Sequence, residues 1–400
     1  MKTLNRSKAH LISQATLVSP AVPGQSCTEA LRGSIKRIII VAGLATAVAA
    51  PVWATQVPDV AGSSNTGVAS VLAGQDTDEA VDPESAAKAE WRAAMRQYST
   101  PARGCFHASY PNMFWERVEC QTGRPRAHPL HTTPKDAQAD VAGNGNDYVA
   151  EAKGLITSAI GKFFDIKGVK SEQSVGIAEY DDDGNLGSNE YSLQINTNGL
   201  LRTDACNSQW YGQPGGGSGC HVWQQFLYST DYASSGEASV YMQYWLLDWG
   251  DSDCPSGYTS SGKDCWTNSS LTSAPDVPPK DLGKVELTAA ASAGGNDTVT
   301  FAYDGEIYST SEWDSWLDIS SVWNKAEFNV VGDGGGSRAV FNKGSSIGVT
   351  LQLVDGSRSA PTCVANDGTT GESNNLNLGK CETFASEFGD NPNIEFTESN

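Results

Sequence analysis

The sequence lacks the short motifs that identify several large enzyme classes. It contains no Gly-x-Ser-x-Gly elbow, no P-loop, no His-Glu-x-x-His zinc motif and no dinucleotide-binding fingerprint. Histidine is also scarce: five occur in 400 residues, and only His221 follows residue 135. Because His221 adjoins Cys220, a predicted disulfide position, we do not expect a Ser-His-Asp triad, which needs a histidine as base.

Basic side chains are few. The chain has 27 Lys and Arg against 47 Asp and Glu, and without residues 1–54 the numbers are 21 and 46. This balance argues against nucleic acid and anionic membranes as partners, since both bind basic surfaces. It is typical of an exported protein, and it also suits a protein that works in acid, where protonation reduces self-repulsion. No motif for a cofactor or a metal is found, so we expect neither.

Long apolar runs are limited to the beginning of the chain. Arg32, Lys36 and Arg37 precede an apolar run over 38–52, and Val52-Trp53-Ala54 has the small residues that a signal-peptidase site requires. We expect residues 1–54 to be a signal peptide and the mature chain to begin near Thr55. A membrane anchor is the alternative, but the run is too short to span a bilayer core comfortably. The predicted location is extracellular, with the periplasm as an alternative, and no membrane contact is expected after cleavage.

Eight cysteines remain after the predicted leader, an even number that suits an oxidising compartment. No Cys-x-x-Cys motif occurs, which argues against a zinc site. Eight cysteines allow 105 pairings. We predict the pairing of neighbours, because each pair closes a short loop bounded by turn-forming residues: Cys105 with Cys120, Cys206 with Cys220, Cys254 with Cys265, and Cys363 with Cys381.

The composition divides the remaining chain into three parts. Residues 55–100 read as a Gly-, Ser- and Ala-rich linker followed by one short helix, which Asp82 would cap and Pro83 would open. Residues 101–135 are basic and contain three of the five histidines, whereas 136–400 hold 13 basic and 37 acidic residues. The basic segment is therefore either a propeptide that docks on the acidic domain or a disulfide-closed part of that domain.

Residues 136–400 show strand after strand with no amphipathic helix between them. Runs such as 299–303, 328–331 and 347–354 are apolar or alternating and rich in β-branched and aromatic residues, and Gly- and Asp-rich turns separate them. This spacing predicts an all-β protein, an antiparallel β-sandwich with a short N-terminal helix.

Two of these runs are dense in Gln, Trp and Tyr. Strand alternation places Trp223 and Gln225 on one face of the run 223–228 and Gln224 on the other. In the run 240–249 it places Tyr241, Gln243 and Trp245 together. Amides within an aromatic strand are costly to bury without partners, so they either bond to one another or meet a ligand. The alternative is an ordinary solvent-facing set of polar residues.

The order of four strands resembles that of the glutamic peptidases of the eqolisin type. The segments are Tyr191-Ser-Leu-Gln-Ile-Asn, Val222-Trp-Gln-Gln-Phe, Tyr241-Met-Gln-Tyr-Trp-Leu-Leu-Asp and Ala326-Glu-Phe-Asn-Val-Val. The resemblance implies a concanavalin A-like double sheet and acid endopeptidase activity. It places the catalytic glutamine at Gln224 and the catalytic glutamate at Glu327. The family's Tyr-Glu-Trp-Tyr-Pro strand is Met242-Gln-Tyr-Trp-Leu here, without the acid or the proline. The chain is also similar to secreted bacterial proteins that end in Phe-Thr-Glu-Ser-Asn, a likeness that implies no activity.

A Glu/Gln pair can hydrolyse a peptide bond. The carboxylate acts as general base on water, the amide stabilises the oxyanion, and the resulting acid protonates the leaving amine. We therefore predict a monomeric secreted hydrolase of glutamic-peptidase type that uses Glu327 and Gln224, and we expect Trp223, Tyr241, Gln243 and Trp245 to contact the substrate. The alternative is a lectin-like module that binds a glycan or another polymer without catalysis.

Other acidic residues leave two further hypotheses open. Glu372 with Glu395 or Glu398 would suit a glycosidase if their carboxyl groups lay about 5–9 Å apart. Asp181, Asp182 and Asp183 form an oxygen-rich loop that resembles a calcium site, but the downstream glutamate of an EF-hand is missing.

Overall fold

The computed structural model describes residues 83–121, 127–129, 141–143, 146–176, 187–207, 219–230, 237–250, 253–387 and 390–400. The predicted signal peptide, the linker, the helix cap at Asp82 and the acidic loop 181–183 lie outside these ranges. In the part of the chain that is described, no helix has the length and apolar character needed to cross a membrane.

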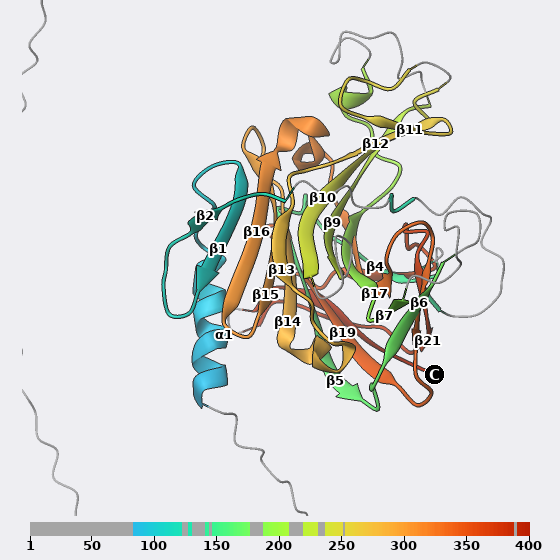
Figure 1. Cartoon of the computed structure of the whole chain (residues 1–400). Coiled ribbons are helices and arrows are strands. Elements are labelled where there is room, and N and C mark those ends of the chain that lie inside the picture. The colour runs from blue at the N-terminus through green and yellow to red at the C-terminus, as the bar shows by residue number, and fades with distance from the viewer. Residues whose placement is uncertain are drawn as a thin grey trace, which may run out of the picture. The chain divides into compact units, whose positions relative to one another are not determined.

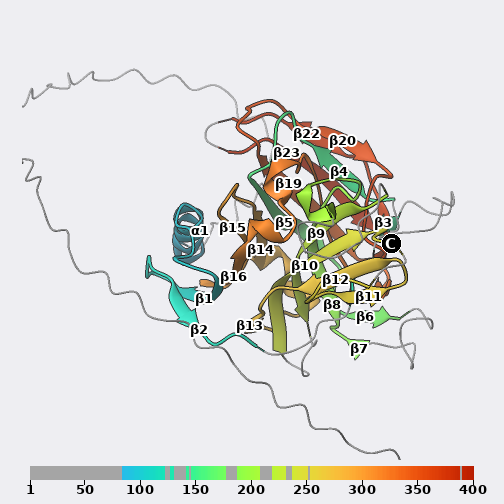
Figure 2. The same ribbon diagram turned by 90° about the horizontal axis from the view of Figure 1, so that it is seen from above.

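Two β-sheets make up the fold (Figures 1 and 2). The larger sheet contains β1 (Gly104–Ser109), β2 (Glu116–Val118), β3 (Val141–Gly143), β5 (Ser158–Lys167), β6 (Glu172–Val175), β7 (Gly187–Ser188), β14 (Val285–Ala290), β15 (Asn296–Tyr303), β16 (Glu306–Trp313), β18 (Arg338–Phe341), β19 (Ser346–Val354), β21 (Ser373–Leu378), β22 (Glu382–Phe384) and β23 (Asn393–Ser399). The smaller sheet contains β4 (Tyr148–Glu151), β8 (Tyr191–Thr197), β9 (His221–Thr230), β10 (Glu237–Leu247), β11 (Thr259–Ser261), β12 (Asp264–Asn268), β13 (Thr272–Pro275), β17 (Lys325–Gly332) and β20 (Thr362–Ala365).

Helical structure is limited to short elements. They are α1 (Pro83–Met95) and the 3₁₀ turns η1 (Asp204–Cys206), η2 (Pro279–Lys284), η3 (Asp314–Trp316) and η4 (Ile319–Ser321). Among the described strand pairs, all are antiparallel except β18 with β21. The predicted all-β sandwich with a short N-terminal helix is confirmed.

The core lies between the two sheets and fixes the position of β17. Tyr228 of β9 stacks on Phe301 of β15 with ring centroids 3.8 Å apart, and Phe328 of β17 packs against Phe163 of β5 at 4.9 Å. A Cβ at Gly161 would lie 2.3 Å from the Phe328 ring, so glycine is required there for the ring to lie flat on the larger sheet. Since Phe328 points inward, its neighbour Glu327 points outward.

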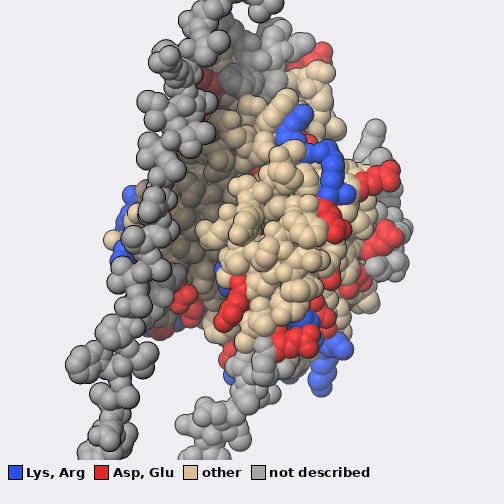
Figure 3. Space-filling view, turned by 90° about the vertical axis from the view of Figure 1, so that its left-hand side faces the viewer, with Lys and Arg blue, Asp and Glu red and all other residues tan. Residues whose placement is uncertain are grey.

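Helix α1 packs on the outer face of the larger sheet. Its Trp91 and Met95 form a small apolar cluster with Ala302 and Ile307. Beside this cluster lies a cavity of about 590 Å³ between the helix and strands β14 and β15. Figure 3 shows this side of the molecule, where the surface is hollowed and largely uncharged.

All four predicted disulfides are confirmed. The bonded pairs are Cys105–Cys120, Cys206–Cys220, Cys254–Cys265 and Cys363–Cys381, and each closes a loop of 11 to 18 residues. Bridges of this number are typical of proteins that fold in an oxidising environment.

The sheet begins before the predicted domain boundary at residue 136. Strand β1 pairs with β16 along its whole length, and Cys105–Cys120 ties β1 to the segment that follows β2. The basic side chains of this segment meet acids on β16: Arg103 lies 3.4 Å from Glu312, and His107 lies 2.6 Å from Glu306. Residues 104–121 are therefore built into the sandwich, while removal of the segment as a propeptide stays a prediction.

Several carboxyl groups of the sandwich are buried. Burial raises the pKa of Glu172 on β6 to about 9 and that of Glu398 on β23 to about 8, against an ordinary value of 4.5. The folded state therefore keeps protons that the unfolded chain releases between about pH 4.5 and 8.

We expect the free energy of unfolding to fall as the pH rises from 5 to 8. Each proton held only by the folded state contributes a slope of about −1.4 kcal/mol per pH unit. Urea unfolding followed by tryptophan fluorescence measures this slope. Glu172→Gln should reduce this slope by the contribution of one proton, whereas Glu119→Gln, at an exposed position, should leave the slope unchanged. A slope that is flat or positive over this range would contradict the expectation.

Candidate functional site

A row of five polar residues crosses the smaller sheet. Glu327 of β17 pairs with Asn196 of β8, which pairs with Gln225 of β9. Gln225 pairs with Gln243 of β10, and Gln243 pairs with Asn268 of β12. Residues directly opposite in antiparallel strands project to the same face. These five side chains, called the polar row below, therefore lie side by side on one face.

The polar row faces away from the larger sheet. Its chain neighbours Phe226, Met242 and Phe328 belong to the core between the sheets. On the outer face, Trp223 and Trp245 form a separate cluster with Leu247.

Gln224 does not lie on the face that carries Glu327, so the predicted pairing of these two residues is wrong. The Gln224 side chain enters the core between the sheets, where its Nε2 donates to Oδ2 of Asp297 on β15 at 2.8 Å. Burial and the neighbouring Asp314 hold the pKa of Asp297 well above its usual range. The amide that shares the face of Glu327 is Gln225, one residue further along β9.

The four residues predicted to contact substrate do lie on the outer face. Trp245 Nε1 donates to Oε1 of Gln225 at 3.1 Å and to Oε1 of Gln243 at 2.9 Å, and Trp223 Nε1 donates to the Thr197 carbonyl at 3.0 Å. All four side chains are buried, as are Glu327 and Gln225. Their contact with substrate stays a prediction.

The loop before β21 covers Glu327. Oε2 of Glu327 accepts hydrogen bonds from the backbone N–H of Thr369 at 2.7 Å, from Thr369 Oγ1 at 3.0 Å and from Asn196 Nδ2 at 3.4 Å. A Cβ at Gly368 would lie 2.8 Å from Oε1 of Glu327, so glycine allows this close approach. Oε1 is buried and has no hydrogen-bond partner among the described residues.

A second carboxyl group, Asp147, lies beside Glu327 and was not singled out in the sequence. Asn329 of β17 donates to Oδ2 of Asp147 at 2.9 Å. Burial raises the pKa of Glu327, and burial together with the charge of Glu327 raises the pKa of Asp147 well above its usual range. The pair therefore favours protonated forms while the face is covered.

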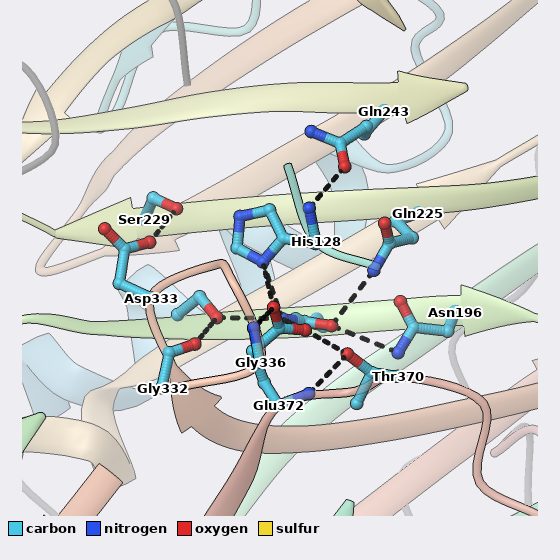
Figure 4. A network of polar contacts seen from close by, with 12 residues as sticks. His128, Asn196, Gln225, Ser229, Gln243, Gly332, Asp333, Gly336, Thr370 and Glu372 are labelled. Atoms are coloured by element: carbon cyan, nitrogen blue, oxygen red, sulfur yellow. Dashed lines mark hydrogen bonds and ion pairs between the residues drawn. The ribbon is translucent and has the colours of Figure 1, made fainter. Parts of the chain in front are cut away.

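The segment Ala127-His128-Pro129 lies across the outer face (Figure 4). Three hydrogen bonds to its main chain hold it in place. Gly335 N–H donates to the Ala127 carbonyl at 2.7 Å, His128 N–H donates to Oε1 of Gln243 at 2.7 Å, and Gly371 N–H donates to the Pro129 carbonyl at 2.8 Å. We call these three residues the covering segment.

The His128 side chain is fully buried among polar groups of the sheet and the loops. Its Nε2 lies 3.0 Å from the Tyr241 hydroxyl, and its Nδ1 lies 3.1 Å from Nε2 of Gln194. Oε1 of Glu372 is 3.6 Å from Nδ1 and accepts from Gly336 N–H at 3.0 Å. The sequence placed His128 only in a basic segment, for which docking on the acidic domain was one of two alternatives. Neither its pocket nor the role of Gln194 was predicted.

The carboxyl groups of the glycosidase hypothesis, Glu372 with Glu395 or Glu398, contact different residues. Glu372 contacts His128 and Gln194 on the outer face, whereas Glu398 accepts hydrogen bonds from Asn374 and Asn329. The Glu395 side chain accepts a hydrogen bond from Thr350 Oγ1 at 3.4 Å. Across the described ranges, no group of three or more His, Cys, Asp or Glu side chains is arranged to hold a metal ion.

No family model and no curated protein matches the chain. Two solved structures show a faint structural resemblance to the chain, and both are of scytalido-glutamic peptidase. The first, with a transition state analogue inhibitor, has a TM-score of 0.23 and 12% identity and covers 70% of this chain and 99% of its own. The second, with a peptide-based analogue, has a TM-score of 0.24 and 11% identity and covers 65% and 98%. At these values the similarity carries no argument about the chemistry of this chain.

The position of Gln224 can be tested by double-mutant cycles. Gln224→Ala removes the amide that Asp297 bonds, so the two residues should show a coupling energy of about 1–3 kcal/mol in urea unfolding. The cycle between Gln224→Ala and Glu327→Ala should give a value within about 0.5 kcal/mol of zero, because their side chains share no partner. Strong coupling in the second cycle would refute the assignment of these residues to opposite faces.

Proposed function

We propose that the chain is a secreted acid endopeptidase of glutamic-peptidase type, in which Glu327 acts with Gln225 rather than Gln224. The structure described above is then a covered, inactive form. The four disulfides and the predicted signal peptide support export.

The observation that carries this proposal is the way the covering segment is held. Its main chain is recognised at three consecutive residues, by Gly335 N–H, Gln243 Oε1 and Gly371 N–H. Main-chain hydrogen bonds of this kind bind an extended polypeptide regardless of its sequence. The same groups would hold a polypeptide substrate across the polar row once the covering segment is displaced.

Glu327 and Gln225 are placed for the chemistry. They lie two strands apart, about 10 Å between Cα atoms at the usual strand spacing. Long side chains that converge from that separation can contact one water and one carbonyl group. The unpartnered Oε1 of Glu327 would take a proton from the water as its oxygen attacks the carbonyl carbon.

Gln225 supplies the second part of the mechanism. Its Nε2 donates to Oε1 of Gln194 at 3.2 Å in the covered form, which orients the amide along the row. In the reaction, the amide would donate to the oxyanion of the tetrahedral intermediate. The protonated Glu327 would then give its proton to the leaving amine, and the carboxylate is restored.

The pKa of Glu327 connects this chemistry to acid conditions. Desolvation is the largest cause of its raised pKa, so uncovering the face should return the pKa toward the ordinary value of 4.5. A carboxyl group that serves as base and then as acid works best near its own pKa. We therefore expect activity between about pH 3 and 5.

A lectin-like binding function is the second candidate. The rings of Trp223, Trp245 and Trp266 lie together, with Trp245 stacked on Trp266 at 6.0 Å, next to the amides of the polar row. Aromatic rings beside amides also suit the binding of sugars. The three main-chain contacts favour a polypeptide instead.

Cleavage of casein between pH 3 and 5 tests the proposal, using the full chain after incubation at the assay pH. Glu327→Gln should lower the rate at least 10³-fold, and Gln225→Ala by about 10²–10³-fold, as expected for loss of an oxyanion donor. Gln173→Ala, at an exposed position on β6, is the matched control and should leave the rate unchanged. Equal cleavage by the wild type and Glu327→Gln would refute the proposal, and glycan binding without cleavage would favour the lectin-like function.

A further inference from the structure

The pocket around the His128 ring places a hydrogen-bonding group beside each of the two ring nitrogen atoms. An imidazole ring in its neutral form has one N–H donor and one acceptor nitrogen. The pocket offers Nε2 of Gln194 to one nitrogen at 3.1 Å and the Tyr241 hydroxyl to the other at 3.0 Å. The question is which of the two donates.

The polar network fixes the direction of the Gln194 amide. Oε1 of Gln194 accepts from Asn196 Nδ2 and from Gln225 Nε2, both at 3.2 Å. Its Nε2 donates to Ser192 Oγ at 2.9 Å and lies 3.4 Å from Oε2 of Glu372. A flipped amide would set its NH₂ group against those of Asn196 and Gln225. Gln194 therefore donates to Nδ1 of His128, and Nδ1 must be the acceptor.

The direction of the hydrogen bond at Nδ1 also fixes the direction of the one at Nε2. With Nδ1 as acceptor, the neutral ring carries its proton on Nε2 and donates to the Tyr241 hydroxyl. The Tyr241 hydroxyl lies 3.1 Å from Ser229 Oγ, which donates to Oδ1 of Asp333 at 2.6 Å. A chain of aligned hydrogen bonds therefore runs from Gln194 through the His128 ring, the Tyr241 hydroxyl and Ser229 to Asp333. Figure 4 shows the His128 ring and the bond between Ser229 and Asp333.

We propose that this pocket is a specificity pocket for a histidine side chain of a polypeptide, and that His128 occupies it in cis as an internal competitor. The cleavage part of this inference rests on the proposed function, whereas the binding part does not. An apolar side chain would leave the Gln194 amide and the Tyr241 hydroxyl without these partners in a buried site. Lysine and arginine have only donors and cannot accept from Gln194.

The size of the preference follows from burial. A buried site that hydrogen-bonds a ligand on two sides discriminates strongly against ligands that lack those groups, because its own polar atoms then each lose a hydrogen bond. We expect a peptide with histidine at this position to bind at least 100-fold more tightly than the same peptide with leucine.

The test uses the full chain with His128→Ala, which removes the ring and keeps the covering segment. Imidazole at pH 8, where it is mostly neutral, should bind this variant with a millimolar dissociation constant and raise its unfolding temperature. 1-Methylimidazole, which keeps the acceptor but has no N–H, should bind at least tenfold more weakly. The double variant His128→Ala/Tyr241→Phe should also bind imidazole at least tenfold more weakly. Equal binding of the two compounds, or binding of neither, overturns the proposal.

A peptide assay covers the case in which His128→Ala does not fold. His128→Asn keeps a donor and an acceptor on a smaller side chain, and it is tested with acetyl-Gly-Ala-His-Pro-Gly-amide and its leucine counterpart. The histidine peptide should bind at least 100-fold more tightly, and equal binding of the two peptides overturns the proposal.

Casein cleavage separates this inference from the proposed function. If both hold, His128→Ala or His128→Asn cleaves casein at least tenfold faster than the wild type, and its preference for sites that contain histidine increases from about pH 3 to 5 as the neutral fraction of the substrate histidine rises. Ligand discrimination without any cleavage supports the pocket and refutes the peptidase. Cleavage that shows no preference for histidine, together with no ligand discrimination, supports the peptidase and refutes the pocket.

Discussion

The outer face of the smaller sheet is polar and yet buried, and this combination constrains everything around it. A polar atom removed from water must find a hydrogen-bond partner or destabilise the fold by several kcal/mol. Within the polar row, amides bond neighbouring amides and the indole N–H of Trp245, whereas Oδ1 of Asn196 has no partner among the described residues. At the margins the partners come from outside the sheet: the covering segment bonds Gln243, and Thr369 bonds Glu327. The sheet and its cover are therefore one hydrogen-bonded unit.

The faces of single strands could be predicted from the sequence, because alternation is a property of the chain itself. The grouping of Tyr241, Gln243 and Trp245, and the separation of Gln225 from Gln224, both agree with the structure. The choice of Gln224 failed for a different reason. Alternation does not say which face of β9 meets the other sheet. That depends on packing against distant residues such as Phe301, and the partner of Gln224 there, Asp297, is more than 70 residues away in the sequence. The disulfides were predictable because each closes a short loop.

The sequence did not predict which segments, far apart along the chain, contact one another in the fold. Strand pairing brings Glu327 next to Asn196 and then Gln225, and no local pattern encodes that register. The same is true of His128, Asp147 and the loop that carries Thr369. One signal for His128 was present, since it lies in a basic segment that precedes an acidic domain. Charge alone predicted docking, whereas the place of docking depends on hydrogen bonds with Gln243 and Gln194.

Protons favour the covered form through its buried carboxyl groups. Glu327 and Asp147 have raised pKa values because they are desolvated, so the covered form holds more protons than an uncovered one, and moderate acid favours the cover. Below the ordinary pKa of about 4.5 both forms are protonated, and this preference stops growing. The His128 ring adds its hydrogen bond with Gln194 to the cover, and Oε1 of Glu372 lies 3.6 Å from the same ring nitrogen. Acid therefore does not displace the cover by itself. Under the proposed function, a polypeptide substrate that replaces the three main-chain bonds and the ring of the covering segment would compensate for their loss.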